Sequence, residues 1–211
     1  MIAEPTNQSE TPLNKVGIIL LAAGASSRMG SPKQLISMGS TSLIHHLAQQ
    51  ALATMYRPVV VVLGANKPAI VPEIVDLHHL TFIDNPHWQS GMASSIKMGL
   101  VGTYMIDKHL DAVVILASDQ PFVSTALIRR MVEVQAIAQK GIVACQYAGQ
   151  VGIPVLFTRK YFEPLLNLEG DKGAKVIVNQ YLEDTALLNF EKGIVDLDTP
   201  TDVEKWKTSL N

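Results

Sequence analysis

Two basic side chains, Arg28 and Lys33, lie in one short segment of mostly small residues, 20–33 (LLAAGASSRMGSPK). Small residues let a backbone approach a ligand closely, and successive backbone N–H groups in such a segment can form a concave anion site. Arg28 offers a planar pair of donors to phosphate oxygens, and Lys33 offers a mobile positive charge. The segment therefore predicts a loop that binds a polyphosphate. The alternative is an ordinary strand-to-helix turn with an exposed arginine.

Two carboxylates, Asp119 and Asp198, also follow apolar stretches. Asp119 comes soon after the apolar run 111–117, and the carboxyl ends of buried parallel strands form the edge where open α/β sheets bind ligands. Carboxylate oxygens beside phosphates are typical magnesium ligands, so both residues are predicted to hold Mg²⁺. The alternative for Asp119 is capping of a helix that begins near Ser124. For Asp198 a neighbour such as Thr199 can serve that need instead.

A Gly/Ser segment, residues 87–100 (HWQSGMASSIKMGL), predicts a second part of a binding site. Gly91 permits a tight turn, and Ser94 or Ser95 stands near the start of a helix. Hydroxyls and free backbone N–H groups can read the edge of a base or hold an anion there. The alternative is simple N-capping by either serine. The charged turn 169–175 (EGDKGAK) either borders a second substrate or connects two helices.

Apolar runs separate these polar segments and predict the elements that must position them. Continuous aliphatic runs are typical of strands buried on both faces, and apolar residues at every third or fourth position are typical of helices with one buried face. The predicted strands are residues 16–21, 59–63, 80–83, 111–117, 142–147 and 152–157, with a short strand from residue 194. The predicted helices are residues 43–52, 68–75, a helix that begins near 95, residues 125–138 with Ile137 among its inward positions, two short pieces around the 169–175 turn, and a terminal helix that Pro200 begins.

This alternation of strands and helices predicts an α/β fold. We expect a three-layer α/β/α sandwich with right-handed crossovers and a Rossmann-like, mostly parallel sheet. A hairpin turn at residues 148–150 makes the sheet mixed. We predict a single domain over residues 15–211 and a flexible tail over residues 1–14, which is polar and lacks the apolar core of a signal peptide.

Composition excludes several classes of partner. Of the 211 residues, 47% are hydrophobic and 17% are charged, which is typical of a globular protein. The net charge of −2 gives no electrostatic case for nucleic acid or an anionic membrane, and no apolar run reaches the roughly 18 residues of a membrane span. The single cysteine, Cys145, lies in an apolar run, which predicts a buried structural thiol in a reducing compartment. We therefore expect a cytoplasmic protein with no nucleic-acid and no membrane partner.

Cations for a triphosphate, together with two acids for Mg²⁺, describe phosphoryl or nucleotidyl transfer. Such chemistry needs positioning and charge neutralisation and no covalent protein nucleophile. The loop has neither the Gly-Lys-Ser/Thr ending of a Walker loop nor the Gly-x-Gly-x-x-Gly of a dinucleotide binder. Kinase, ATPase and dehydrogenase functions are therefore disfavoured.

Residues 21–30 (LAAGASSRMG) together with Lys33 resemble the signature loop of the nucleotidyltransferases that share the molybdenum-cofactor guanylyltransferase fold. Further segments resemble the branch of that family that contains molybdenum cofactor cytidylyltransferase: residues 91–96, 119–121, 154–157, 170–174 and 196–200. The resemblance extends over residues 16–206.

The resemblance implies a Mg²⁺-dependent enzyme in which the terminal phosphate of molybdopterin attacks the α-phosphorus of CTP and pyrophosphate leaves. It implies catalytic roles for Arg28, Lys33 and Asp119, and metal ligation by Asp119 and Asp198. The Ala-Ala-Gly form of residues 22–24 resembles the cytidine-using members. The nucleotide-binding residues that it implies are Leu21, Ala22, Ala23, Gly24, Arg28, Lys33, Gly91 and Ser95, the last two at the base. The acceptor-binding residues that it implies are Gly152, Pro154 and Asp171.

Residue 153 departs from the family pattern. Many relatives carry a histidine between the glycine and the proline, whereas this chain has Ile153, so a polar group that could touch the acceptor is absent. Two alternatives therefore stay open: a nucleotidyltransferase for another phosphorylated acceptor, such as a sugar or alditol phosphate, and a non-catalytic nucleotide-binding factor for molybdoenzyme maturation. Under the main hypothesis the partners are CTP, a molybdopterin-type acceptor and a molybdoenzyme that receives the product.

Overall fold

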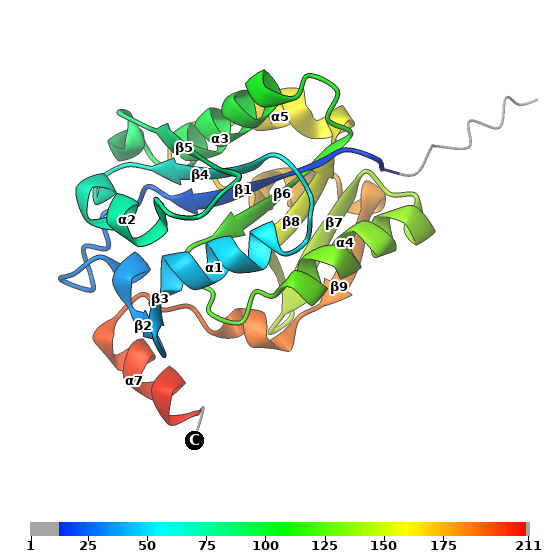
Figure 1. The fold of residues 1–211 in the computed structure, drawn as a ribbon. Helices are drawn as coiled ribbons and strands as arrows, with labels where there is room; N and C mark the ends of the chain where they lie inside the picture. The colour runs from blue at the N-terminus through cyan, green and yellow to red at the C-terminus, as the bar shows by residue number, and fades with distance from the viewer. Residues whose placement is uncertain (1–12, 210–211) are drawn as a thin grey trace, which may run out of the picture.

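A computed structural model describes residues 13–209 of the protein and shows one seven-stranded sheet (Figure 1). Its strand order is β5-β4-β1-β6-β8-β7-β9. The strands are β1 (Val16–Ala22), β4 (Val59–Leu63), β5 (Leu80–Asp84), β6 (Ala112–Ala117), β7 (Ile142–Tyr147), β8 (Gln150–Thr158) and β9 (Thr185–Asn189). A separate ribbon pairs β2 (Ser37–Met38) with β3 (Thr41–Ser42) in antiparallel fashion.

The central strands are parallel and covered on both faces. β1 pairs in parallel with β4 and with β6, and β4 pairs in parallel with β5. All five residues of β4, a continuous VVVVL run, are fully buried, as expected for a parallel strand between two helical layers. β8 runs antiparallel to both β6 and β7, and β9 runs parallel to β7. The predicted mixed, mostly parallel sheet is therefore confirmed.

Helices cover both faces of the sheet, which confirms the three-layer architecture. One face packs against α1 (Leu43–Leu52), α2 (Lys67–Ile74), α4 (Thr125–Ala138) and α7 (Pro200–Thr208). The opposite face packs against α3 (Met92–Ile106), α5 (Phe162–Leu166) and α6 (Lys175–Gln180). Alternate residues of β1 serve the two layers, because successive side chains of a strand point to opposite faces.

Two elements differ from the sequence-based expectation near the carboxyl terminus. The short strand predicted from residue 194 is wrong: Glu191–Ile194 is a 3₁₀ helix, and the segment after it bonds to a loop, with Leu197 N–H donating to the Asp119 carbonyl at 3.0 Å. The strand β9 was not predicted. It is a short edge strand whose side chains are partly exposed, so it lacks the continuous apolar run that marks the central strands.

Ile137 was predicted to face inward on α4, and this is wrong, since 76% of its side chain is exposed. Ile128 and Met131 are fully buried. Residue 137 lies nine positions after Ile128, and at about 100° per residue this places it on the opposite face of the helix. The buried residue of the last turn is the polar Gln135, whose Nε2 donates to the Lys140 carbonyl at 3.3 Å.

The division into a flexible tail (1–14) and a domain (15–211) stays a prediction, because residues 1–12 lie outside the described part of the chain. Among residues 13–209, no helix combines the length and the apolar composition that crossing a bilayer requires. Cys145 is fully buried, and burial raises the pKa of its thiol to about 12, in agreement with a structural thiol.

Close packing of α3 on the sheet depends on Gly99. A Cβ at this position would collide with Ile19 Cγ2 and lie 3.0 Å from Val62 Cγ2. Both of these side chains belong to central strands, so neither can move away freely.

We predict that Gly99→Ala lowers the free energy of unfolding by about 1–3 kcal/mol, as overpacking of a dense core does. The loss should appear although alanine favours a helix by about 1 kcal/mol over glycine. Denaturant unfolding measures it. Gly102→Ala in the same helix meets only the end of the Ile83 side chain, so it should cost less. An equal or larger loss in Gly102→Ala would contradict this explanation.

Candidate active site

A cleft of about 380 Å³ opens at the carboxyl edge of β1 and β6. The segments that follow these two strands meet here, because parallel strands end at the same edge of a sheet. Trp88, which follows β5, also lines the cleft. Predicted site residues that line it are Leu21, Ala23, Gly24, Lys33, Gly91, Ser95, Asp119 and Asp171. Ala22 is buried, and Arg28 and Asp198 join the site through ion pairs.

Hydrogen bonds within the loop after β1 fix its shape. Ser26 has a positive φ of 55°, and its Oγ accepts from the Lys33 N–H at 3.1 Å. The fully buried Gln34 donates its Nε2 to the carbonyls of Ala22 at 3.3 Å and Gly24 at 3.5 Å. A Cβ at Gly24 would meet no atom of the described residues within 4 Å, so a ligand has room there. Sequence reasoning missed Gln34, because no local pattern marks this amide as buried.

Lys33 lies between two carboxylates. Its Nζ is 2.6 Å from Asp119 Oδ2 and 2.7 Å from Asp198 Oδ1, and Arg28 contacts the second oxygen of Asp198. Only 15% of the Lys33 side chain is exposed, against 71% for Arg28. Burial alone would lower the pKa of Lys33, but the ion pairs with Asp119 and Asp198 outweigh it and raise the pKa above its usual value of 10.5. Lys33 therefore stays charged and neutralises the two acids.

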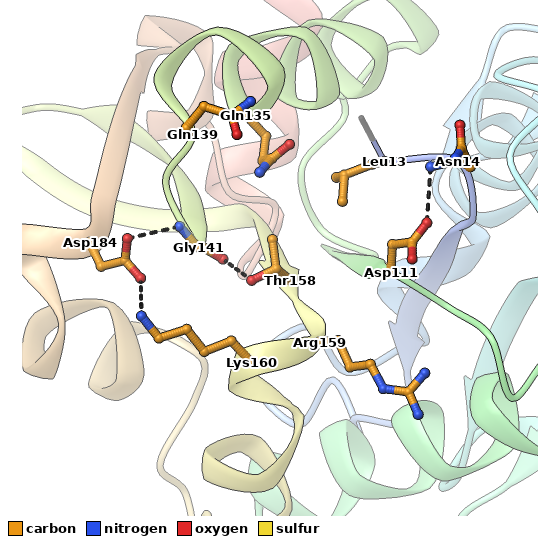
Figure 2. Close-up of a pocket in the computed structure, with 10 residues that line it drawn as sticks. All are labelled: Leu13, Asn14, Asp111, Gln135, Gln139, Gly141, Thr158, Arg159, Lys160 and Asp184. Atoms are coloured by element: carbon orange, nitrogen blue, oxygen red, sulfur yellow. Dashed lines mark hydrogen bonds and ion pairs between the residues drawn. The ribbon is translucent and has the colours of Figure 1, made fainter. Parts of the chain in front are cut away.

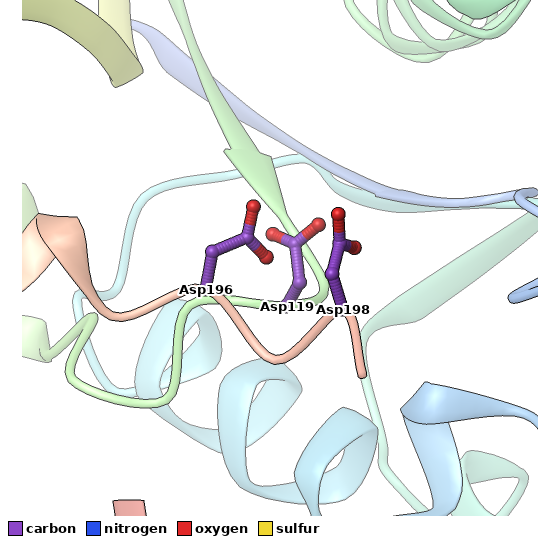
Figure 3. A group of neighbouring side chains, drawn as sticks. All are labelled: Asp119, Asp196 and Asp198. Carbon is purple, nitrogen blue, oxygen red and sulfur yellow. The ribbon is translucent and has the colours of Figure 1, made fainter. Parts of the chain in front are cut away.

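A third carboxylate, Asp196, completes an acidic cluster with Asp119 and Asp198 (Figure 3). One oxygen of each lies within 4.8 Å of the others. Asp119 follows β6, and the other two belong to the segment before α7. Sequence reasoning did not assign Asp196 to the metal, although its spacing from Asp198 was a usable signal, since alternate residues of an extended segment point to the same side.

Other residues cap the helices nearest to these acids. Ser124 is the N-cap of α4 and accepts from the Leu127 N–H. Thr199 and Asp202 form a reciprocal capping box at the start of α7. The capping alternative therefore does not account for Asp119 or Asp198.

The pKa of Asp196 is raised from its usual 3.8 to about 7. Partial burial of the carboxyl group is the first cause, and the negative charges of Asp119 and Asp198 follow. The residue as a whole is exposed, although its carboxyl group is partly buried among the other two acids. A cation bound among the three carboxylates would remove their repulsion. A set of carboxylate oxygens suits a hard divalent cation such as Mg²⁺ or Mn²⁺, so these residues fit a metal ion.

Gly91, which was predicted to contact the nucleotide base, packs against the charged turn 169–175. It is the N-cap of α3 with a φ of 103°, and a Cβ there would collide with the Gly170 carbonyl. Neither Ser94 nor Ser95, the two predicted N-cap candidates, occupies the N-cap position. Ser95 is buried in the first turns of the helix, and its Oγ accepts from Asn85 Nδ2 at 3.0 Å.

Ile153 and Asp171 line the cleft on the predicted acceptor side. Gly152 and Pro154, on either side of Ile153 in β8, are buried, because alternate residues of a strand face opposite ways. A Cβ at Gly152 would collide with the Tyr147 hydroxyl. The structure therefore brings Asp171 to the cleft and places Ile153, between the two predicted residues, on its wall.

A second pocket of about 340 Å³ lies at the opposite edge of the sheet (Figure 2). Its charged groups already have partners: Lys160 contacts Asp184 at 2.8 Å, Asp111 accepts from the Asn14 N–H at 2.9 Å, and Arg159 donates to the Lys108 carbonyl at 3.0 Å. It lies away from the carboxyl ends of β1 and β6, where ligands of open α/β sheets bind. The cleft beside Lys33 is therefore the candidate active site.

A mostly parallel sheet with a small-residue loop, two cations and three carboxylates at its carboxyl edge is the arrangement expected of a site for nucleotidyl transfer. The model of the MobA-like NTP transferase domain matches residues 18–185. The chain belongs to this family and is a nucleotidyltransferase, which confirms the resemblance seen in its signature loop.

Nicotine blue oxidoreductase from Paenarthrobacter nicotinovorans is 29% identical over 202 residues, which cover 90% of this chain and 95% of that protein. The solved homologue of Mycobacterium tuberculosis rv0371c from Mycobacterium sp. strain JC1 is 26% identical with a TM-score of 0.78, over 92% of this chain and 96% of that one. Rv0371C of Mycobacterium tuberculosis H37Rv, solved in complex with manganese, is 26% identical with a TM-score of 0.73, over 92% and 99%.

Lys33 contacts both Asp119 and Asp198, so it would compete with a divalent cation for these two acids. We predict that Lys33→Met raises the affinity of the nucleotide-free protein for Mn²⁺ by roughly tenfold, which is a change of about 1.4 kcal/mol, because the lysine no longer competes for the acids. A Mn²⁺ titration followed by electron paramagnetic resonance measures it. Lys67→Met breaks the exposed pair with Asp84 and should leave the affinity unchanged. An equal gain in both variants would contradict direct competition.

The raised pKa of Asp196 gives a pH signature in the metal-free protein. The folded state holds this proton more tightly than the unfolded state, so the contribution of Asp196 to stability is lost as the pH rises from about 4 to about 7. Asp196→Asn cannot ionise and escapes this loss. The difference in Tm between Asp196→Asn and wild type, measured in EDTA, should therefore increase from pH 4 to pH 7. The variant should remain the more stable protein at pH 8. A Tm difference that does not depend on pH would refute the raised pKa of Asp196.

Proposed function

We propose that the protein is a Mg²⁺-dependent cytidylyltransferase that transfers CMP from CTP to a molybdopterin-type acceptor and releases pyrophosphate. The observation that carries the proposal is the contact of Lys33 and Arg28 with Asp119 and Asp198 beside the loop after β1. This arrangement offers cations to a triphosphate and carboxylates to a metal at one place. Phosphoryl-type transfer depends mainly on such positioning and charge neutralisation.

The finer choices rest on the sequence. The Ala-Ala-Gly form of residues 22–24 supports CTP, and the segments 154–157 and 170–174 support molybdopterin. We further propose that the enzyme works in the cytoplasm and hands its product to a molybdoenzyme. A cleft of about 380 Å³ falls within the usual range of small-molecule sites, and Trp88 is half-buried in its wall, where it offers a flat surface to a ring.

In the proposed mechanism, Lys33 leaves the two acids and, with Arg28, binds the triphosphate. An oxygen of the acceptor's terminal phosphate attacks the α-phosphorus of CTP, and the bond from that phosphorus to the bridging oxygen of pyrophosphate breaks. The two cations neutralise the charge on the departing pyrophosphate. Mg²⁺, held by Asp119, Asp198 and the neighbouring Asp196, would supply Lewis-acid stabilisation of phosphate oxygens.

Transfer to a sugar or alditol phosphate is the second candidate function. The observation that favours it is Ile153, which presents an apolar side chain on the cleft wall. This side chain can make no hydrogen bond to a pterin ring, so residue 153 gives molybdopterin no advantage over another phosphorylated acceptor. Because the chain is a nucleotidyltransferase, the non-catalytic alternative is not supported.

A pyrophosphate-release assay tests the proposal with each of CTP, GTP, ATP and UTP, with Mg²⁺, and with either molybdopterin or a sugar phosphate. We expect release with CTP and molybdopterin, and none after EDTA treatment. Lys33→Ala should lower kcat by about 10²–10³-fold, the usual loss when one group that stabilises transition-state charge is removed. Lys67→Ala, which breaks only an exposed ion pair, serves as the matched control and should keep the wild-type rate.

Each contrary result has a distinct meaning. A preference for GTP would overturn the base assignment, and release with a sugar phosphate alone would replace the acceptor. Wild-type rates in Lys33→Ala would refute the role of the loop. Redox turnover without pyrophosphate release would point to the oxidoreductase activity that the name of the Paenarthrobacter relative describes.

A further inference from the structure

Gln120 follows Asp119 directly, and only 5% of its surface is exposed. Its Nε2 donates to the carbonyl oxygens of Ile153 at 3.0 Å and Gly193 at 3.2 Å. The same nitrogen lies 3.3 Å from the Tyr147 hydroxyl, which itself donates to the Ile153 carbonyl at 3.1 Å. Because both carbonyls can only accept hydrogen bonds, the amide nitrogen must face them.

These acceptors belong to segments that lie far apart in the sequence and meet at the Gln120 amide. Ile153 belongs to β8 and lines the cleft. Gly193 lies three residues before Asp196, in the chain that leads to the acids before α7. The backbone adds a further link, since the Asp119 carbonyl accepts from the Leu197 N–H at 3.0 Å. The Gln120 amide therefore joins the loop after β6 to both neighbouring segments.

The packing around this amide is tight. A Cβ at Gly152 or Gly193 would collide with Tyr147, so the tyrosine ring fills the space beside the amide. Among the described residues, the buried Gln120 Oε1 has no hydrogen-bond partner. A buried acceptor without a partner lowers stability, and a leucine of similar size would avoid that cost. What glutamine adds here is its pair of N–H donors, so its role lies in the connections that they make.

We propose that Gln120 is a positioning residue for the metal site. Through its amide donors it fixes Asp119 relative to the segment that carries Asp196 and Asp198, and it acts without touching metal or substrate. The inference rests on the metal site of the proposed function. Partners that orient metal ligands typically change metal affinity 10- to 100-fold when they are lost.

Gln120→Leu removes the donors and keeps about the same volume. In a Mn²⁺ titration of the nucleotide-free protein, we expect an affinity at least about tenfold weaker than that of wild type. Gln135→Leu is the matched control: this second glutamine is 3% exposed and donates to the Lys140 carbonyl near the other edge of the sheet. It should leave the Mn²⁺ affinity unchanged.

Tyr147→Phe is a milder second variant, because it removes only the hydroxyl that Gln120 and Ile153 share. It should weaken Mn²⁺ binding by a smaller factor, and it decides the question if Gln120→Leu does not fold. Unchanged Mn²⁺ affinity in the folded variant, or an equal loss in Gln135→Leu, would overturn the inference. So would a wild-type protein that binds no Mn²⁺. A wild-type protein that binds Mn²⁺ but transfers no nucleotide would contradict the proposed function alone, and the Gln120 comparison would still stand.

Discussion

Repulsion between like charges is the main constraint on this site. Three carboxylates have oxygens within 4.8 Å of one another, and such a group is strained unless a positive charge lies among them. Lys33 supplies that charge at 2.6 and 2.7 Å, and Arg28 adds a second cation from the exposed side. Two sets of hydrogen bonds bring Lys33 and these acids together. One set fixes the loop after β1, and the other ties the segment before α7 to Asp119.

The fold makes this meeting possible across long stretches of chain. Lys33 is 86 residues from Asp119 and 165 residues from Asp198. Parallel strands between two helical layers carry their following loops to one edge (Figure 1). The capping box at the start of α7 fixes the segment that carries Asp198. The buried side-chain amides of Gln34 and Gln120 donate hydrogen bonds to backbone carbonyls of these loops and their neighbours. The polar groups of the site therefore rest on polar supports within an apolar core.

The same constraint explains how the site could bind its ligands together. While Lys33 pairs with the acids, a free metal ion must compete with it for them. A nucleotide offers phosphates to Lys33, and the acids then become available to a cation that also neutralises the nucleotide. Each ligand would thus relieve a cost of binding the other, which is a coupling free energy between two sites. Such coupling would keep the acids paired whether or not substrate is present.

The sequence by itself determined the central strands, most of the helices, the hairpin before β8 and the residue types of the site, because apolar periodicity, capping and loop chemistry are local patterns. Only the tertiary structure decided which surfaces meet. It placed the edge strand β9, turned Ile137 outward, buried two amides and added Asp196 to the acids. It also set Lys33 between Asp119 and Asp198. A contact between residues so far apart depends on how strands and loops pack, and no local pattern contains that information.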